Sequence, residues 1–140
     1  MNNLKNRKSI RLKTYNYQKI GAYFITICIQ NRENRLGNII NDEMVLNHAG
    51  IMSNQWIENL SEHFDNISIN HKIVMPNHIH FIIEIKYYNQ NTANIPKMIQ
   101  WFKTMSTNQY IRGVKNDIYP PFNKRIWQRN YYEHIIRNEK

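Results

Sequence analysis

Two histidines, His78 and His80, stand on either side of a single apolar residue, Ile79. Successive side chains of a β-strand point to opposite faces, so both imidazoles would share one face, about 7 Å apart along the backbone. Ile79 would then point into the core. Two imidazoles on one face of a rigid strand can ligate a divalent metal ion. Such an ion keeps open positions for further ligands, which it can polarise as a Lewis acid.

The spacing also has a plainer interpretation, because half-exposed histidines without a ligand are common on strands. The apolar Ile79 and the turn that precedes His78 add support for a metal site, and the alternative stays open at this point. The other histidines are expected to face solvent or the core, and they are His48, His63, His71 and His134.

The histidine pair is expected to begin a strand over 78–85, which follows a strand over 67–75. Pro76 and Asn77 lie between them, and Pro76 has no N–H to donate to a ladder, so it marks a turn or a bulge. Hydrophobic patterning predicts the remaining elements. They are, in chain order, a strand over 23–30, a polar turn at 31–37, a short strand over 39–46, a helix over 48–64 with Asn47 as its N-cap, a polar linker over 87–94, a helix from Pro96 to about Ile111 that Gly113 ends, a loop over 115–124 and a strand over 125–136.

This order of elements indicates an α+β fold, namely a ferredoxin-like antiparallel sheet with helices packed on one face. The strand that carries the histidine pair would be central in that sheet, in keeping with the apolar run that follows His80.

The positive charge of the chain is concentrated at its two ends. The net charge is +9, of which residues 1–20 contribute +6, residues 21–96 contribute −3 and residues 97–140 contribute +6. A partner with a dense line of negative charge, such as nucleic acid, would explain this distribution. Solubility or a disordered basic arm is the alternative explanation.

The length of 140 residues corresponds to one compact domain. We expect a basic N-terminal arm over 1–20 and a single domain over 21–140. No apolar stretch approaches the roughly 18 residues of a membrane span, and the first residues lack the apolar core of a signal peptide. A cytoplasmic location without membrane contact is therefore expected. Cys28 is the single cysteine, which excludes an intrachain disulfide.

Four blocks of the sequence resemble the REP-associated tyrosine transposases, relatives of the single-tyrosine insertion-sequence transposases. The blocks are YFITICIQNRE (23–33), IVMPNHIHFII (73–83), MIQWFKTMSTNQYI (98–111) and IWQRNYYEHIIRNE (126–139). They occur in order over nearly the whole chain. This family belongs to the HUH endonucleases, in which two histidines surround a hydrophobic residue.

The resemblance implies an HUH-endonuclease fold in which His78 and His80 bind a divalent ion, Mg²⁺ or Mn²⁺. It also implies a substrate of single-stranded or hairpin DNA, which is cleaved and rejoined through a phosphotyrosine intermediate. Imidazole suits Mn²⁺ better than Mg²⁺, so the natural ion stays open. A homodimer is possible, because relatives include dimers as well as monomers.

The resemblance places the tyrosine nucleophile on a helix that follows the last block, about a dozen residues further on, with a polar third metal ligand one turn beyond it. Both positions lie past Lys140, so the domain is expected to be C-terminally incomplete. Tyr132 and Tyr131 are the fallback nucleophiles, although both fall within an expected strand. Three interpretations follow: a chain that keeps the fold and half of the site, which we favour; an enzyme that uses Tyr131 or Tyr132; or a DNA-binding module without chemistry.

Single-stranded DNA is held by cationic tracks with aromatic platforms. The candidate DNA-binding residues are Arg32, Lys103, Arg125, Arg129, Trp127 and Arg137. The alternative is that the aromatic residues belong to the core and the charges are merely solvated. An RNA-binding protein of similar charge and fold is a further alternative.

Overall fold

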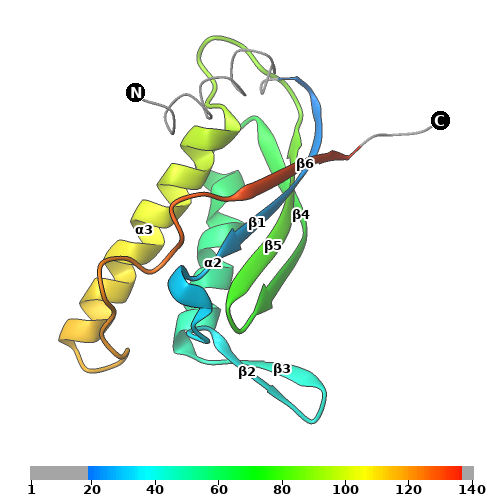
Figure 1. Ribbon diagram of the computed structural model, residues 1–140. Coiled ribbons are helices and arrows are strands. Elements are labelled where there is room, and N and C mark those ends of the chain that lie inside the picture. The colour runs from blue at the N-terminus through cyan, green and yellow to red at the C-terminus, as the bar shows by residue number, and fades with distance from the viewer. Residues whose placement is uncertain (1–18, 137–140) are drawn as a thin grey trace, which may run out of the picture.

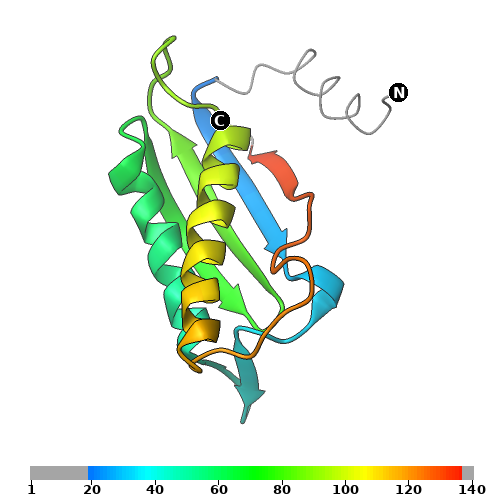
Figure 2. The ribbon, with the colours of Figure 1, turned by 90° about the vertical axis from the view of Figure 1, so that its left-hand side faces the viewer.

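The computed structural model describes residues 19–136. Four strands, β1 (Gly21–Cys28), β4 (Ile67–Met75), β5 (His78–Ile85) and β6 (Tyr132–Ile136), form one sheet in the order β4-β5-β1-β6, and all neighbours are antiparallel. Two helices, α2 (His48–His63) and α3 (Ile95–Lys115), cover one face of this sheet (Figures 1 and 2). The predicted ferredoxin-like α+β fold is confirmed. The predicted arm over 1–20 lies outside the described residues, except for its last two.

Alternation along the two central strands separates a buried face from an open face. Ile25 and Ile27 of β1 and Ile79 and Phe81 of β5 are fully buried beneath the helices. They pack with apolar residues of α3 such as Phe102 in one hydrophobic core. The intervening residues of both strands point to the other face, which no helix of the described chain covers (Figure 2). The histidine pair therefore lies on a surface that a ligand can reach.

The helix α2 begins as the sequence predicts. The Asn47 side chain accepts a hydrogen bond from the Gly50 backbone N–H at 2.8 Å, which satisfies one of the unpaired donors of the first turn. Gly50 also allows close packing, because a Cβ there would overlap the carbonyl oxygen of Leu36.

The helix α3 continues past Gly113 to Lys115, so the prediction that Gly113 ends it is wrong. This glycine serves close packing instead. A Cβ at position 113 would overlap the ring of Tyr119, which folds back over the end of the helix.

A hairpin replaces the short strand predicted over 39–46. Its strands are β2 (Gly37–Ile40) and β3 (Glu43–Leu46), and the hairpin projects from the body of the domain (Figure 1). The turn residues Asn41 and Asp42 have φ angles of 51° and 66°, as a two-residue hairpin turn requires.

The strand predicted over 125–136 is also too long, because only Tyr132–Ile136 joins the sheet as β6. Residues 125–131 run beside α3 without regular structure. Trp127 turns into the core in this segment, where its indole N–H donates to Ser106 Oγ at 2.9 Å. Lys103 Nζ donates to the carbonyls of Gln128 and Arg129 at 2.9 and 2.8 Å, which fixes the segment against α3.

No helix in the described part of the chain is long and apolar enough to cross a membrane.

Candidate metal site and strand-binding surface

His78 and His80 lie on the same open face of β5, as the spacing predicts. Their ring centroids are 4.6 Å apart, and the ring planes are inclined at 75°. Both side chains are partly exposed. Phe24 of β1 stacks on the His80 ring with a centroid distance of 5.2 Å. The two imidazoles are therefore adjacent, oriented and accessible.

A hydrogen bond orients each ring through its Nδ1 atom. His78 Nδ1 lies 2.7 Å from Asn77 Oδ1, and Asn77 Nδ2 donates to the Arg32 carbonyl at 3.4 Å. Because an amide oxygen only accepts, His78 Nδ1 carries the proton, and the neutral ring has its lone pair at Nε2. His80 Nδ1 is held in a similar way by Thr26 Oγ1 at 2.9 Å. Partners of this kind are typical of metal-ligating histidines.

The electrostatic environment favours neutral rings. Burial lowers the pKa of His78 below its usual value, and positive charge on His80 and on Arg32 lowers it further. Burial also lowers the pKa of His80. Neutral imidazole is the form that binds a metal ion, so the pair can bind metal at neutral pH without first losing protons.

These donors fit a divalent ion, but they do not complete its coordination. Among the described residues, no cluster of three or more His, Cys, Asp or Glu side chains could hold a metal ion. The two Nε2 atoms would supply two ligands, and water or phosphate oxygen would fill the other positions. Nitrogen ligands suit Mn²⁺ better than Mg²⁺, which prefers an all-oxygen shell.

Replacing Asn77 with alanine is expected to lower the affinity for Mn²⁺ by about 10-fold, because outer partners of ligating histidines typically contribute 10–100-fold. Isothermal titration with Mn²⁺ would measure the affinity, and ¹⁵N NMR of the metal-free protein should show loss of the single His78 tautomer. Asn38→Ala, in the projecting hairpin, is the matched control. An unchanged tautomer in Asn77→Ala would contradict the assigned role.

The two fallback tyrosines lie on opposite faces of the sheet. Tyr132 pairs with Thr26, which pairs with His80 on its other side, so the three residues share one row of the open face. Two strand spacings separate Tyr132 from His80, about 10 Å between backbones. Tyr131 faces α3 instead, and its hydroxyl donates to Glu133 Oε1 at 3.4 Å. Of the two tyrosines, Tyr132 therefore shares the open face with the histidine pair, and Tyr131 does not.

Of the predicted DNA-binding residues, Arg32 lies beside the histidine pair. It is exposed and follows β1 in the short helix η1 (Gln30–Arg32), with a φ of 55° that is uncommon for a non-glycine residue. Its positive charge contributes to the lowered pKa of His78, after burial and the charge of His80.

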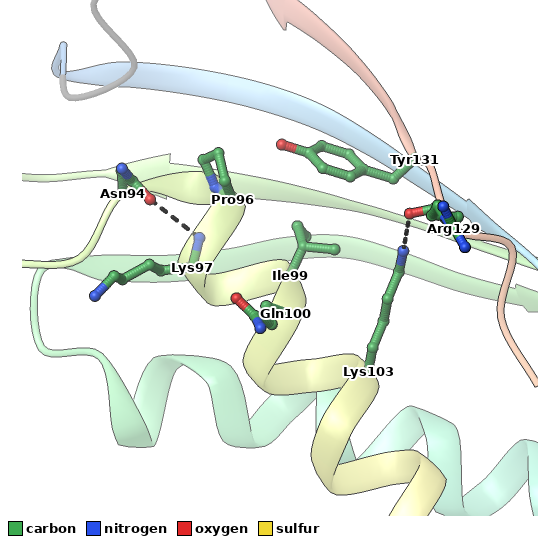
Figure 3. A pocket seen from close by; sticks show the side chains of 8 residues that line it. All are labelled: Asn94, Pro96, Lys97, Ile99, Gln100, Lys103, Arg129 and Tyr131. Carbon is green, nitrogen blue, oxygen red and sulfur yellow. Dashed lines mark hydrogen bonds between the residues drawn. The ribbon is translucent and has the colours of Figure 1, made fainter. Parts of the chain in front are cut away.

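The other predicted DNA-binding residues lie elsewhere. Lys103 and Arg129 line a hollow between α3 and residues 125–131 (Figure 3), and together with Arg125 they line a second hollow there. Arg137 lies outside the described residues. Trp127 is only 4% exposed, so the prediction that its ring stacks on a base is corrected: it is a core residue.

The remaining histidines do not join the pair. His63 stacks on Trp101 with a centroid distance of 4.3 Å, a packing role. His48 and His71 are exposed on α2 and β4. His134 faces the open side of the sheet, one row away from His80, opposite Phe24. The sequence did not predict that Thr26 and Asn77 orient the two imidazole rings. Only Asn77 could have been suspected, because it is next to His78 in the sequence.

Comparisons with known proteins bear on the family of the chain. The family model described as "Transposase IS200 like" matches residues 17–140. An uncharacterized protein of Haemophilus influenzae is 41% identical over 96% of this chain and 81% of its own length. A second protein of that organism, provisionally named a REP-associated tyrosine transposase, is 28% identical over 89% of this chain and 65% of its own length.

Two solved structures share the fold. A REP-associated tyrosine transposase bound to a REP hairpin has a TM-score of 0.60 and 23% identity, over 89% of this chain and 61% of that one. A transposase candidate from Deinococcus radiodurans has a TM-score of 0.61 and 12% identity, over 88% and 84%. The chain thus spans less than two thirds of the two relatives described as REP-associated transposases.

Proposed function

Because this chain belongs to the family of IS200-like transposases, we propose that it binds single-stranded or hairpin DNA and acts in metal-dependent cleavage and rejoining of that DNA. The observation that carries the proposal is the pair of adjacent imidazoles on an open sheet face, each oriented through Nδ1. A solved relative of the same fold is bound to a REP hairpin, which supports hairpin DNA as the partner.

Some residues of the site would bind the metal ion or the phosphate, and others orient the metal-binding side chains. His78 and His80 would hold a divalent ion, which polarises a phosphate oxygen and offsets the charge that develops on the phosphoryl group. Asn77 and Thr26 keep the two rings oriented, and Arg32 neutralises a neighbouring phosphate. Electrostatic groups fixed in advance around a reacting phosphate are an effective form of catalysis.

The covalent step proposed for the family is an exchange of phosphoesters. A tyrosine hydroxyl attacks phosphorus, one deoxyribose oxygen leaves and takes up a proton, and the phosphotyrosine conserves the ester bond. A strand with a free hydroxyl then reverses the step and is joined. Of the described tyrosines, Tyr132 shares a face with the histidines, which supports it as the position to examine first.

Incubation of the protein with a labelled DNA hairpin that carries single-stranded flanks, in the presence of Mn²⁺, is expected to give a protease-sensitive covalent band on a denaturing gel. Mass spectrometry of the modified peptide would identify the tyrosine. Tyr132→Phe should remove an adduct formed at that residue, and Tyr131→Phe is the matched control because its ring faces α3.

The second candidate function is a DNA-binding module without chemistry. The observation that favours it is that the described residues supply two metal-ligating side chains and no third His, Cys, Asp or Glu to join them. Salt-sensitive binding of single-stranded DNA without any covalent band, and unaffected by loss of both histidines, would support this function and contradict the first.

A further inference from the structure

Two neighbouring hollows lie between α3 and residues 125–131, and we name them together the α3 groove. Their volumes are about 370 and 410 Å³. The first is lined by residues near the start of α3 and by Tyr131, and the second by the middle of α3 and residues 125–129. Lys103 and Arg129 line both hollows, so the two adjoin where the Lys103 side chain reaches across from α3 to residues 128 and 129.

The α3 groove is cationic. Lys97, Arg125 and Arg129 line it, and none of the described residues that line either hollow is Asp or Glu. Glu133 lies near Tyr131 but lines neither hollow. Lys103 has a different role, because its ammonium group binds two backbone carbonyls and thereby holds the wall of the groove in place. The groove therefore offers three positive side chains to an anion along a fixed wall.

The neutral lining also suits a nucleotide strand. Gln100, Thr104 and Asn108 line the groove and are exposed on α3, where their side chains can donate hydrogen bonds. The Tyr131 ring extends over Pro96 and Ile99 at the first hollow (Figure 3). Sites for single strands combine such a cationic track with aromatic side chains on which bases stack. The volumes of the hollows are at the lower end of the roughly 300–1,000 Å³ typical of small-ligand sites, a size that suits a single nucleotide.

One wall of the second hollow lies beside the row of the sheet that contains His78. The Gln128 backbone N–H donates to the Cys28 carbonyl at 2.8 Å, and Cys28 is the β1 partner of His78. Gln128 lines the second hollow. Its backbone is therefore about 10 Å from that of His78, two strand spacings. A DNA strand that leaves the groove near Gln128 has only the edge of the β-sheet to cross before it reaches the histidines.

We propose that the α3 groove binds a single strand of DNA and guides it around the edge of the sheet to His78 and His80. This inference rests on the proposed function, because it assumes that the histidine pair acts on the strand. The phosphates contact Lys97, Arg125 and Arg129, and a base stacks on Tyr131.

The test compares two double variants of equal net charge. In Lys97→Gln/Arg129→Gln both changes lie in the groove, whereas in Lys72→Gln/Lys86→Gln both lie at β4 and the end of β5 and line neither hollow. Binding of a 20-nucleotide fluorescent DNA strand would be measured by anisotropy between about 50 and 200 mM salt. In the groove variant, Kd should rise about 10-fold, and the slope of log K against log salt should fall by about 1.4, since each lost phosphate contact contributes about 0.7.

The control variant should change Kd by less than about 3-fold, since its charges contact no phosphate in the groove. Equal losses in both variants would overturn the inference, because only net charge would then matter. Equal competition by duplex DNA, or tighter binding of RNA of the same sequence, would also overturn it.

The Mn²⁺ affinity and the covalent band separate this inference from the proposed function. The groove variant should bind Mn²⁺ like the unmodified protein. If the groove variant also binds the DNA strand like the unmodified protein, while His78→Ala abolishes the covalent DNA adduct, the inference fails and the proposed function stands. If the groove variant loses the strand but the unmodified protein forms no adduct, the groove is supported and cleavage is refuted.

Discussion

Replacing His78 with alanine is expected to lower the affinity for Mn²⁺ by at least about 100-fold, more than loss of an outer partner of a ligating histidine. The reason is that the described residues offer two imidazoles and no third acidic, thiol or imidazole ligand in the cluster. With one ring removed, a single nitrogen remains, and one exposed imidazole binds Mn²⁺ weakly. The same change should abolish any covalent DNA adduct. His80→Ala should behave in the same way, and titration calorimetry would measure both.

Two histidine controls make this result specific. His48 is exposed on α2, and His134 lies on the same open face as the pair but in the next row. Alanine at either position should leave the Mn²⁺ affinity within about 2-fold, because neither ring adjoins the pair. If His78→Ala bound Mn²⁺ as tightly as these controls do, the metal site would have to lie elsewhere, and the proposed function would lose its main support.

The histidine pair was predictable because a strand has a period of two residues, which places residues 78 and 80 on one face whatever the rest of the fold is. The cap at Asn47 was predictable for a similar reason, since its bond to Gly50 spans three residues. Both features depend on backbone geometry that a short window of sequence determines.

The partners of the pair were not predictable in the same way. Thr26 contacts His80 across 54 residues of sequence, and only the pairing of β1 with β5 brings them together. The orientation of Asn77 depends on the Arg32 carbonyl, which is 45 residues away. A single sequence does not show which residues of different β-strands and loops contact one another. The burial of alternate residues in a strand, in contrast, follows from the local pattern of apolar residues.

The end of the chain shows how packing overrides propensity. Residues 125–136 are rich in aromatic and β-branched types, which favour a strand. Yet the chain is regular only from Tyr132. The Trp127 ring packs against Phe102 of α3, and only an isolated bridge between Trp127 and Ile29 joins this segment to the chain that follows β1. This segment consequently forms the wall of the α3 groove.

Replacing Trp127 with alanine is expected to lower the free energy of unfolding by about 3–5 kcal/mol, a large part of the roughly 5–15 kcal/mol typical of a domain. Its ring packs on Phe102 with a centroid distance of 5.3 Å, and its N–H donates to Ser106 Oγ. Chemical denaturation would measure the loss. Trp127→Phe keeps part of the packing but loses the hydrogen bond and part of the ring volume, so it should cost less than Trp127→Ala, about 1–3 kcal/mol.

The same pair of variants distinguishes a core residue from a stacking platform. Tyr132→Ala is the matched aromatic control, because that ring is 61% exposed and its loss should change the free energy of unfolding by less than about 1 kcal/mol. If Trp127 is a core residue, folded Trp127→Phe should bind single-stranded DNA with nearly unchanged affinity. A stable Trp127→Ala protein with weakened DNA binding would show instead that the indole contacts DNA bases. Trp127 would then be a DNA-binding residue, as the sequence predicted.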